Sequence, residues 1–288
     1  MDPIVGVDLS VHNWRRGVPF GMLGRLHGMG VRFLFARASI GTEVDPAFDA
    51  NRHRGTFRSW VPGGYHYLVD SVPGDRQAAT FVGEVQRTGG IEGLVTSLDV
   101  EDDNTPPIRN HVSMHQVEAF VRAFKDAHPK HRLGLYANRS TWNRLGNPDF
   151  EDVGFDFVWN ALWPRGVNTP ADLPGKPPLS FGGAGRAPLW QWGSLEVRSF
   201  TGGNILHLDG DAWYGTLDEL RALGTQIATP IQDRPAYRDA FNATLALALD
   251  AIGGVTPASG GPAVVAGSKD ALEAAIQAVQ DEKLGRKG

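Results

Sequence analysis

Two carboxylates close a stretch of the chain that is otherwise apolar. Residues 94–102 read Leu-Val-Thr-Ser-Leu-Asp-Val-Glu-Asp, which is typical of a buried strand whose end carries Asp99 and Glu101. These acids are two positions apart, so on an extended chain their side chains point to the same face, with Cα atoms roughly 6.5 to 7 Å apart. Paired acids on one face are costly to bury and can perform general acid and base chemistry. The stretch therefore predicts a catalytic site at the end of a strand.

A second strand ends in the same way near the start of the chain. Residues 4–7 are apolar and lead to Asp8, after which residues 9–14 form a polar and aromatic loop. An aspartate at a strand end is most often a turn former or a helix cap, so Asp8 taken alone indicates no function. Asp8 becomes a candidate site residue because, like Asp99, it is an acid at the end of an apolar strand.

Strands and helices alternate over the first half of the sequence. We predict strands at residues 4–7, 31–36, 63–67, 94–100 and 132–136, separated by helices at residues 20–29, 45–57, 73–87 and 113–128. The last of these helices has apolar residues at spacings of three and four, and Pro129 follows it. Short alternation favours parallel βα units, and in a barrel of such units the carboxyl ends of the strands form the active-site face. The acids fall at this face.

The alternation of predicted strands and helices becomes irregular after residue 136. We predict further strands at residues 155–159, 188–192 and 205–208, but Pro, Gly and Asn fill much of the sequence between them. The expected fold class is therefore α/β, an irregular TIM-like (β/α) barrel whose later units lack helices.

A helical extension is expected after the barrel. We place the boundary near residues 224–230, with a barrel at residues 1–226 and an extension at residues 227–288. Residues 233–252 are predicted as a helix, and residues 253–268 have the Gly, Pro, Ala and Ser composition of a linker. A short apolar stripe follows at helical spacing, which we expect to pack on the barrel or on another copy of the chain.

Composition limits the partners of the chain. Its 288 residues are 41% apolar and 21% charged, which suits one full-sized core with an extension rather than two equal domains. The net charge is -4 and Lys and Arg are dispersed, so we expect neither nucleic acid nor membrane as a partner. The absence of cysteine excludes a disulfide framework and thiolate metal sites. No signal peptide is visible in residues 1–8, and no run approaches the roughly 20 apolar residues of a membrane span, so we expect a soluble chain made in the cytoplasm.

Four sequence motifs together resemble those of a known family. They are Gly6-Val7-Asp8-Leu9-Ser10, Gly64-Tyr65-His66-Tyr67, Leu98-Asp99-Val100-Glu101 and Leu208-Asp209-Gly210-Asp211-Ala212-Trp213-Tyr214-Gly215-Thr216. Their order and spacing, with Trp190-Gln191-Trp192 before the last motif, resemble the family 25 glycoside hydrolases, the Chalaropsis-type lysozymes that cleave the glycan of bacterial cell walls. Each motif alone is weak, whereas the set is specific over residues 4 to about 222.

The resemblance implies a fold and an activity. It implies an irregular barrel of eight strands and an N-acetylmuramidase, which hydrolyses the β-1,4 bond from N-acetylmuramic acid to N-acetylglucosamine in peptidoglycan glycan strands. No cofactor and no metal are expected. Carried over residue by residue, Glu101 is the general acid, and Asp8, Asp99 and Asp209 line the same pocket.

The chemistry of glycoside cleavage divides the work between carboxyl groups in unlike environments. One donates a proton to the leaving oxygen, and another stabilises the oxocarbenium-like transition state. We expect the charges of Asp8 and Asp99 to raise the pKa of Glu101 and keep it protonated near neutral pH. Asp99 either attacks directly or stabilises an oxazolinium ion formed by the N-acetyl group of the substrate.

Aromatic side chains provide candidate sugar-binding faces, because pyranose rings present apolar C–H patches. The candidates are Tyr65, Trp14, Tyr136, Trp163, Trp192 and Trp213. The sequence also departs from the family pattern, with Ile40 where an acidic residue is common and with Gly210 and Asp211 where an apolar residue and Asn are commoner. We expect Asp211 to be a solvated or structural group.

Other interpretations of the sequence remain open. A wall-glycan binding or virion structural protein could keep the barrel without turnover, and a metal-dependent carbohydrate hydrolase or deacetylase could use the acids with His12 or His66. His111 and His115 have metal-ligand spacing in a predicted helix, but an exposed helix face is favoured because no Glu follows His111. The leading interpretation is a phage endolysin, held in the host cytoplasm and released to the wall by a holin, whose extension binds the wall or self-associates.

Overall fold

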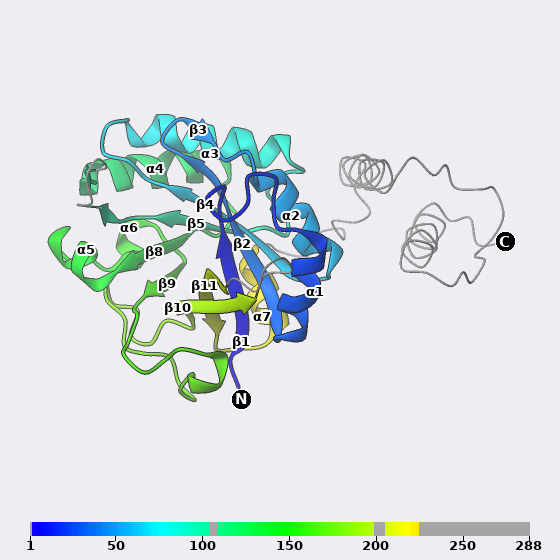
Figure 1. The fold of residues 1–288 in the computed structure, drawn as a ribbon. Helices are drawn as coiled ribbons and strands as arrows, with labels where there is room; N and C mark the ends of the chain where they lie inside the picture. The colour runs from blue at the N-terminus through cyan, green and yellow to red at the C-terminus, as the bar shows by residue number, and fades with distance from the viewer. Residues whose placement is uncertain (1, 104–108, 199–204, 225–288) are drawn as a thin grey trace, which may run out of the picture. The chain divides into compact units, whose positions relative to one another are not determined.

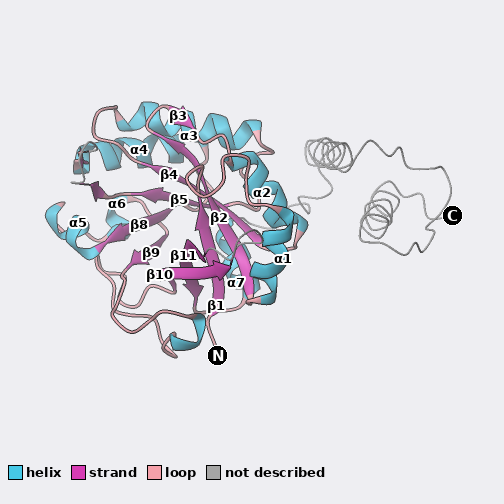
Figure 2. Ribbon diagram, in the orientation of Figure 1, coloured by secondary structure: helices cyan, strands magenta, loops and turns pink. Residues whose placement is uncertain are grey.

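Eight strands close into a barrel in the computed structural model, which describes residues 2–103, 109–198 and 205–224 (Figures 1 and 2). In their order around the barrel, the strands are β1 (Ile4–Leu9), β2 (Val31–Ile40), β4 (Val61–Tyr67), β5 (Val95–Asp99), β8 (Gly134–Asn138), β9 (Phe157–Ala161), β10 (Leu189–Arg198) and β11 (Ile205–Trp213). Pairing of β1 with β2 closes the ring, and the short β3 (Glu43–Val44) extends the sheet beside β2. Each of the eight segments predicted as a strand overlaps one of these strands, which confirms the predicted irregular barrel.

One strand runs against the others. The pairs from β1 through β10 are parallel, whereas β11 is antiparallel to both of its neighbours. Its register with β1 pairs Asp209 with Asp8 and Trp213 with Ile4. Because β11 is reversed, its first half lies at the carboxyl ends of the parallel strands, while Trp213 lies at the opposite end of the barrel.

Four long helices follow the early strands, as predicted. They are α1 (Phe20–Gly28), α2 (Phe48–Phe57), α3 (Gly74–Arg87) and α4 (Met114–Ala127), and α3 and α4 lie side by side in Figure 1. A capping box between Ser113 and Gln116 starts α4. Helix α2 begins later than predicted, at Phe48, because the carboxylate of Asp45 accepts a hydrogen bond from the backbone N–H of Ala47.

The later units carry only short helices, where we had expected none. These are α5 (Arg139–Arg144), α6 (Phe150–Val153), a 3-10 turn (Pro170–Asp172) and α7 (Leu217–Gly224). A two-stranded ribbon of β6 (Asp102–Asp103) and β7 (Asn110–His111) precedes α4. His111 therefore lies in a strand rather than in the predicted helix with His115, so the helical metal-ligand spacing does not apply.

Apolar side chains form two layers, one inside the barrel and one between the barrel and its helices. Phe33 and Phe35 fill the interior and are almost fully buried. Glycines on neighbouring strands leave space for them, since a Cβ at Gly6 or Gly63 would lie 2.1 Å from the ring of Phe33 or Phe35. This alternation of absent and large side chains packs the barrel as a core rather than as a pore.

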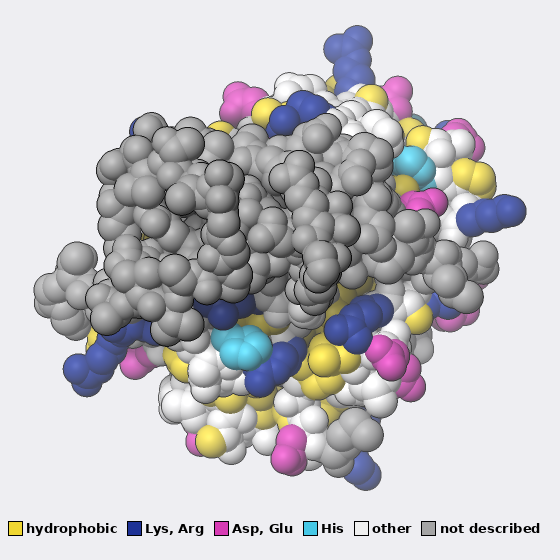
Figure 3. Space-filling view, turned by 90° about the vertical axis from the view of Figure 1, so that its right-hand side faces the viewer, with side chains coloured by type: hydrophobic (Ala, Val, Ile, Leu, Met, Phe, Trp, Pro, Cys, Tyr) yellow, Lys and Arg dark blue, Asp and Glu magenta, His cyan; other side chains and the backbone are white. Residues whose placement is uncertain are grey.

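The expected extension, residues 227–288, lies outside the described residues. No helix among the described residues is long and apolar enough to cross a membrane. On the face drawn in Figure 3, basic and acidic side chains both appear on the visible described surface.

Candidate active site

A small polar cavity of about 170 Å³ lies at the carboxyl ends of the parallel strands. Its lining side chains come from all eight barrel strands and the residues that directly follow them, and are Asp8, Arg37, Tyr65, Tyr67, Asp99, Glu101, Tyr136, Trp159, Gln191 and Asp209. The structure thus brings together all four acids that the sequence singled out, although they are spread over most of the chain. A larger groove between the β4–α3 connection and α4 contains none of them.

Gln191 connects several of these groups and was missed in the sequence analysis. Its Nε2 donates to Asp8 Oδ2 at 2.8 Å, and its Oε1 accepts from the Tyr136 hydroxyl at 2.8 Å. The same Oε1 accepts from Trp163 Nε1 at 2.9 Å. Only the Trp190-Gln191-Trp192 motif marked this position in the sequence.

Asp8 is a buried acid at the end of β1. Burial raises its pKa well above the ordinary value, and the charge of Asp209 raises it further. Hydrogen bonds from Gln191 and Tyr65 act in the opposite direction, because they stabilise the ionised form. Asp8 therefore has both a cost of ionisation and donors that offset part of it.

Asp99 is a buried acid, and one of its carboxylate oxygens lacks a hydrogen-bond donor in the described part of the chain. It is 6% exposed, and its Oδ1 is buried without a hydrogen-bond partner among the described residues. Burial raises its pKa well above the ordinary value, followed by the charges of Glu101 and Asp8, while Arg37 lowers it. The guanidinium of Arg37 is already bound to Asp45, with Nε 3.0 Å from Oδ2, so its charge is shared.

Glu101 has a raised pKa, as expected for a general acid. The largest cause is burial, and the charges of Asp209 and Asp103 add to it, whereas a hydrogen bond with the Tyr136 hydroxyl lowers the pKa. We had expected the charges of Asp8 and Asp99 to be the cause, so the direction is as predicted and the physical origin is different. Glu101 follows the end of β5 and lines the cavity, where loss of hydration favours the neutral acid.

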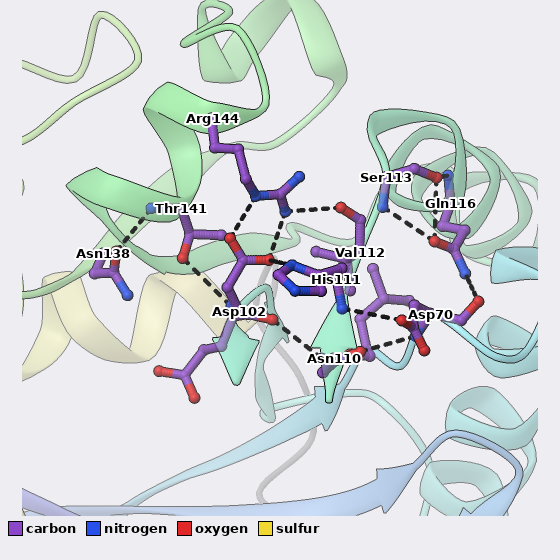
Figure 4. Close-up of polar contacts among 12 residues, drawn as sticks. Asp70, Asp102, Asn110, His111, Val112, Ser113, Gln116, Asn138, Thr141 and Arg144 are labelled. Atoms are coloured by element: carbon purple, nitrogen blue, oxygen red, sulfur yellow. Dashed lines mark hydrogen bonds and ion pairs between the residues drawn. The ribbon is translucent and has the colours of Figure 1, made fainter. Parts of the chain in front are cut away.

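A polar network outside the cavity holds the backbone on both sides of Glu101 (Figure 4). The Nδ2 of Asn110 donates to the Glu101 carbonyl at 3.0 Å and to the Leu68 carbonyl at 2.8 Å. On the other side, the carboxylate of Asp102 forms an ion pair with Arg144. Asn110 is 2% exposed, so these bonds are protected from water and can position the loop after β5.

The predicted aromatic residues fall into two groups. Tyr65 and Tyr136 line the cavity, and Trp163 is 60% exposed beside it, through its bond to Gln191. The expectation for Trp192 and Trp213 needs correction, because they are 0% and 5% exposed and line no part of the cavity.

Strand geometry explains this correction. Neighbouring residues of a strand face opposite sides, so when Gln191 points inward Trp192 points to the helical layer. Trp213 lies at the far end of the barrel because β11 is reversed. Trp14 is partly buried against the outer core layer and does not line the cavity either.

Three further residues that line the cavity, Arg37, Tyr67 and Trp159, were not recognised as site residues from the sequence. Trp159 lies in the cavity wall, where its ring packs against Tyr136 with centroids 4.7 Å apart. Its Nε1 donates to Asp211 Oδ1 at 2.9 Å. Asp211 is 0% exposed, so the expectation of a solvated group is wrong and the structural alternative remains.

The histidines of the metal-dependent interpretation lie elsewhere. Both ring nitrogens of His66 are engaged, with Nδ1 2.8 Å from Ser39 Oγ and Nε2 3.1 Å from Gln77 Oε1. Burial lowers the pKa of His66 to about 4, and its ring stacks on Phe120 outside the cavity. His12 does not line the cavity. Within the described ranges, no three His, Asp or Glu side chains are grouped so as to hold a metal ion.

The closed barrel gathers buried carboxyl groups at the carboxyl ends of its strands, which is where barrel enzymes have their active sites. No protein-family model matches the chain, and no curated protein matches it. Among solved structures, the chain is similar to a family GH25 lysozyme from Aspergillus fumigatus, with a TM-score of 0.59 and 23% identity over 78% of this chain and 100% of that one.

Two more solved structures are similar to this chain in fold. A muramidase from Trichobolus zukalii has a TM-score of 0.57 and 23% identity, over 77% of this chain and 98% of that one. The catalytic domain of an endolysin from a bacteriophage of Listeria monocytogenes has a TM-score of 0.50 and 20% identity, over 76% of this chain and 97% of that one. The chain therefore has the fold of the family 25 glycoside hydrolases, as the resemblance predicted.

Proposed function

We propose that this protein is a peptidoglycan hydrolase that cleaves the β-1,4 bond between N-acetylmuramic acid and N-acetylglucosamine. One observation carries the proposal: the cavity collects Glu101, Asp99, Asp8 and Asp209 at the active-site face of the barrel. Burial of so many acids is costly for folding and useful for glycoside hydrolysis, which needs carboxyl groups in unlike states. The likeness in fold to lysozymes and a muramidase supports the choice of glycan.

The acids divide the reaction between them. Glu101, whose raised pKa favours the protonated form, donates its proton to the leaving glycosidic oxygen as the bond to the anomeric carbon breaks. Asp99 attacks that carbon or stabilises the oxazolinium ion formed by the substrate's own N-acetyl group. Water then completes hydrolysis and returns a proton to Glu101. Tyr65 and Tyr136 in the wall and Trp163 beside the cavity supply surfaces for the sugar rings.

The reaction products test the proposal. Purified peptidoglycan is digested with the wild type and with Glu101→Gln, the fragments are reduced with borohydride, and mass spectrometry identifies the reducing ends. New reducing ends at muramic acid from the wild type, and none from Glu101→Gln, are the expected result. Glu118→Gln, at an exposed position on α4, is the matched control and should release the same fragments as the wild type.

The remaining outcomes separate the alternatives. Reducing ends at glucosamine would keep the fold and change the bond that is cleaved. Retained binding to peptidoglycan with no release would favour a wall-glycan binding or virion structural protein. Activity that is lost on treatment with a chelator would favour the metal-dependent hydrolase.

We also propose that the enzyme is a phage endolysin that reaches the wall after holin-dependent release from the host cytoplasm. The likeness to an endolysin catalytic domain supports this assignment. The extension at residues 227–288 would then bind the wall or associate with another copy of the chain. Lysis of cells after co-expression with a holin, and none without it, is the expected result.

A further inference from the structure

Asp211 is a buried acid that has no role in the proposed mechanism. It lies two residues after Asp209 in β11, a strand without a register shift against β1. Residues two apart in a strand share a face. Asp211 therefore faces the barrel interior together with Asp209 and Asp8, one level deeper than the cavity, and it is 0% exposed.

The hydrogen bonds of Asp211 differ from those of Asp8. Asp211 Oδ1 accepts one bond, from Trp159 Nε1 at 2.9 Å. Its Oδ2 is buried and receives no hydrogen bond from a donor group among the described residues, and the carboxyl group next to it is that of Asp8. Asp8 by contrast accepts from Gln191 at 2.8 Å and from Tyr65. An ionised carboxylate with a bare buried oxygen is costly, so a proton shared between the two acids belongs on Asp211.

The surrounding charges favour the same protonation state. Besides Asp8 and Asp211 themselves, the charged and titratable groups that line the cavity are Arg37 of β2, Tyr65 and Tyr67 of β4, Asp99 and Glu101 at the end of β5, Tyr136 of β8 and Asp209 of β11. Burial raises the pKa of Asp211 well above its ordinary value, and so do the charges of Asp8 and Asp209 and a hydrogen bond to Asp8. Arg37, the basic group of the set, is bound to Asp45.

We propose that Asp211 is a positioning residue that stays protonated and donates its carboxyl O–H to the carboxylate of Asp8, which fixes Asp8 as an ionised acid of the cavity. A hydrogen bond from an acid to a carboxylate is charge-assisted and stronger than one between neutral groups. This hydrogen bond orients the Asp8 carboxylate, as does the hydrogen bond from Gln191. The effect on rate rests on the proposed function, whereas the protonation of Asp211 does not.

Two substitutions of similar size separate the roles of Asp211. Asp211→Asn keeps an acceptor for Trp159 and supplies an N–H donor for Asp8 at every pH, whereas Asp211→Leu supplies neither. In Asp211→Leu the acid limb of the kcat/KM profile should move up by about one pH unit, because the ionised form of Asp8 loses a donor. In Asp211→Asn the acid limb should stay in place, and most of the rate lost in Asp211→Leu should return. A purely structural role would change rate and stability without moving the limb.

The outcome for Asp211→Asn can overturn the proposal. If Asp211 were ionised, replacing it with Asn would remove a negative charge beside Asp8 and move the acid limb to lower pH. An infrared difference spectrum between the wild type and Asp211→Asn at neutral pH provides a second readout, which needs no substrate. The carbonyl band of a protonated carboxyl group is expected, and its absence refutes the proposal even if the protein proves inactive on peptidoglycan. Asp126→Asn, at an exposed position on α4, should give no such band.

Discussion

Gln191 Nε2 lies 2.8 Å from Asp8 Oδ2, although the two residues are 183 positions apart in the chain. The contact joins the first strand of the barrel to the seventh across its interior. It also places Asp8, Tyr136 and Trp163 on one side chain, since Gln191 Oε1 accepts from both aromatic residues. The amide therefore sets the arrangement of one wall of the cavity.

We expect Gln191→Met to lower kcat on peptidoglycan by about tenfold or more, because a hydrogen bond to a charged group contributes roughly 1.5–3 kcal/mol. Methionine has a similar length and no donor, so Asp8 loses a group that favours its ionised form. The acid limb of the pH–rate profile should move upward. Gln86→Met, on the exposed side of α3, is the control, and an unchanged rate in Gln191→Met would contradict the assigned role.

Asp99→Asn should abolish most turnover while leaving the fold intact. The substitution keeps the shape of the side chain and removes the negative charge that attacks the anomeric carbon or stabilises the oxazolinium ion. Turnover is measured from released reducing ends, and the fold from the circular dichroism spectrum. A normal rate for this variant would exclude Asp99 from the chemistry.

The same substitution should stabilise the protein, and more so as pH rises. The pKa of Asp99 is raised above its ordinary value of 3.8, so the folded state binds more protons than the unfolded state, and stability is lost as pH rises from about 4 through the folded pKa. Asparagine does not titrate. The stability gained by Asp99→Asn should therefore be small near pH 4 and grow as the pH rises towards neutrality. Each kcal/mol gained would raise the Tm by roughly 2–4 °C.

The comparison of variants isolates this effect from other titrating groups. His66 and His131 have pKa values lowered to about 4, so stability falls as pH decreases from about 6.5 towards 4 in every variant. Their contribution cancels when the wild type is subtracted at each pH. Urea unfolding at four pH values measures the difference, with Asp126→Asn as the exposed control. A difference that does not change with pH would contradict the raised pKa of Asp99.

The sequence predicted the barrel because its strands are short apolar runs with clear ends. The acids at those ends followed from the same pattern, since a buried strand that finishes in Asp99 and Glu101 has no packing reason to do so. Gln191 and Trp159 could not be predicted in this way. Each lies in an apolar or aromatic strand, and its role depends on which strands become neighbours when the barrel closes.

The reversed direction of β11 also lay beyond sequence patterns. The spacing of apolar residues indicates a strand but does not show in which direction that strand runs. The short connection between β10 and β11 is compatible with an antiparallel pair. The reversal decides that Asp209 lies at the cavity and that Trp213 lies at the far end of the barrel. The predicted sugar-binding role of Trp213 failed for this reason.

Asn110→Ala should lower kcat and leave KM nearly unchanged. Asn110 binds the carbonyls of Leu68 and Glu101 and accepts from the backbone N–H of Asp70 at 2.9 Å. Removing it leaves buried polar groups unpaired, at a cost of about 1–3 kcal/mol each, and frees the loop that carries Glu101, the proposed general acid. Kinetics on a soluble glycan fragment check the split between kcat and KM. Asn143→Ala, at an exposed position on α5, should change neither, and equal losses in both variants would refute a positioning role for Asn110.

Trp163→Ala should raise KM more than it lowers kcat. The indole is 60% exposed, yet its Nε1 is fixed by a hydrogen bond to Gln191 at the cavity, so a ring face is held beside the proposed active site. Loss of a sugar-stacking surface weakens substrate binding in the ground state and the transition state alike, which appears in KM. We expect an increase of about fivefold to thirtyfold, equivalent to roughly 1–2 kcal/mol. Leu179→Ala removes an apolar side chain of similar exposure, 59%, that does not line the cavity, and an equal rise in KM for both variants would show that general surface hydrophobicity, rather than Trp163, binds the glycan.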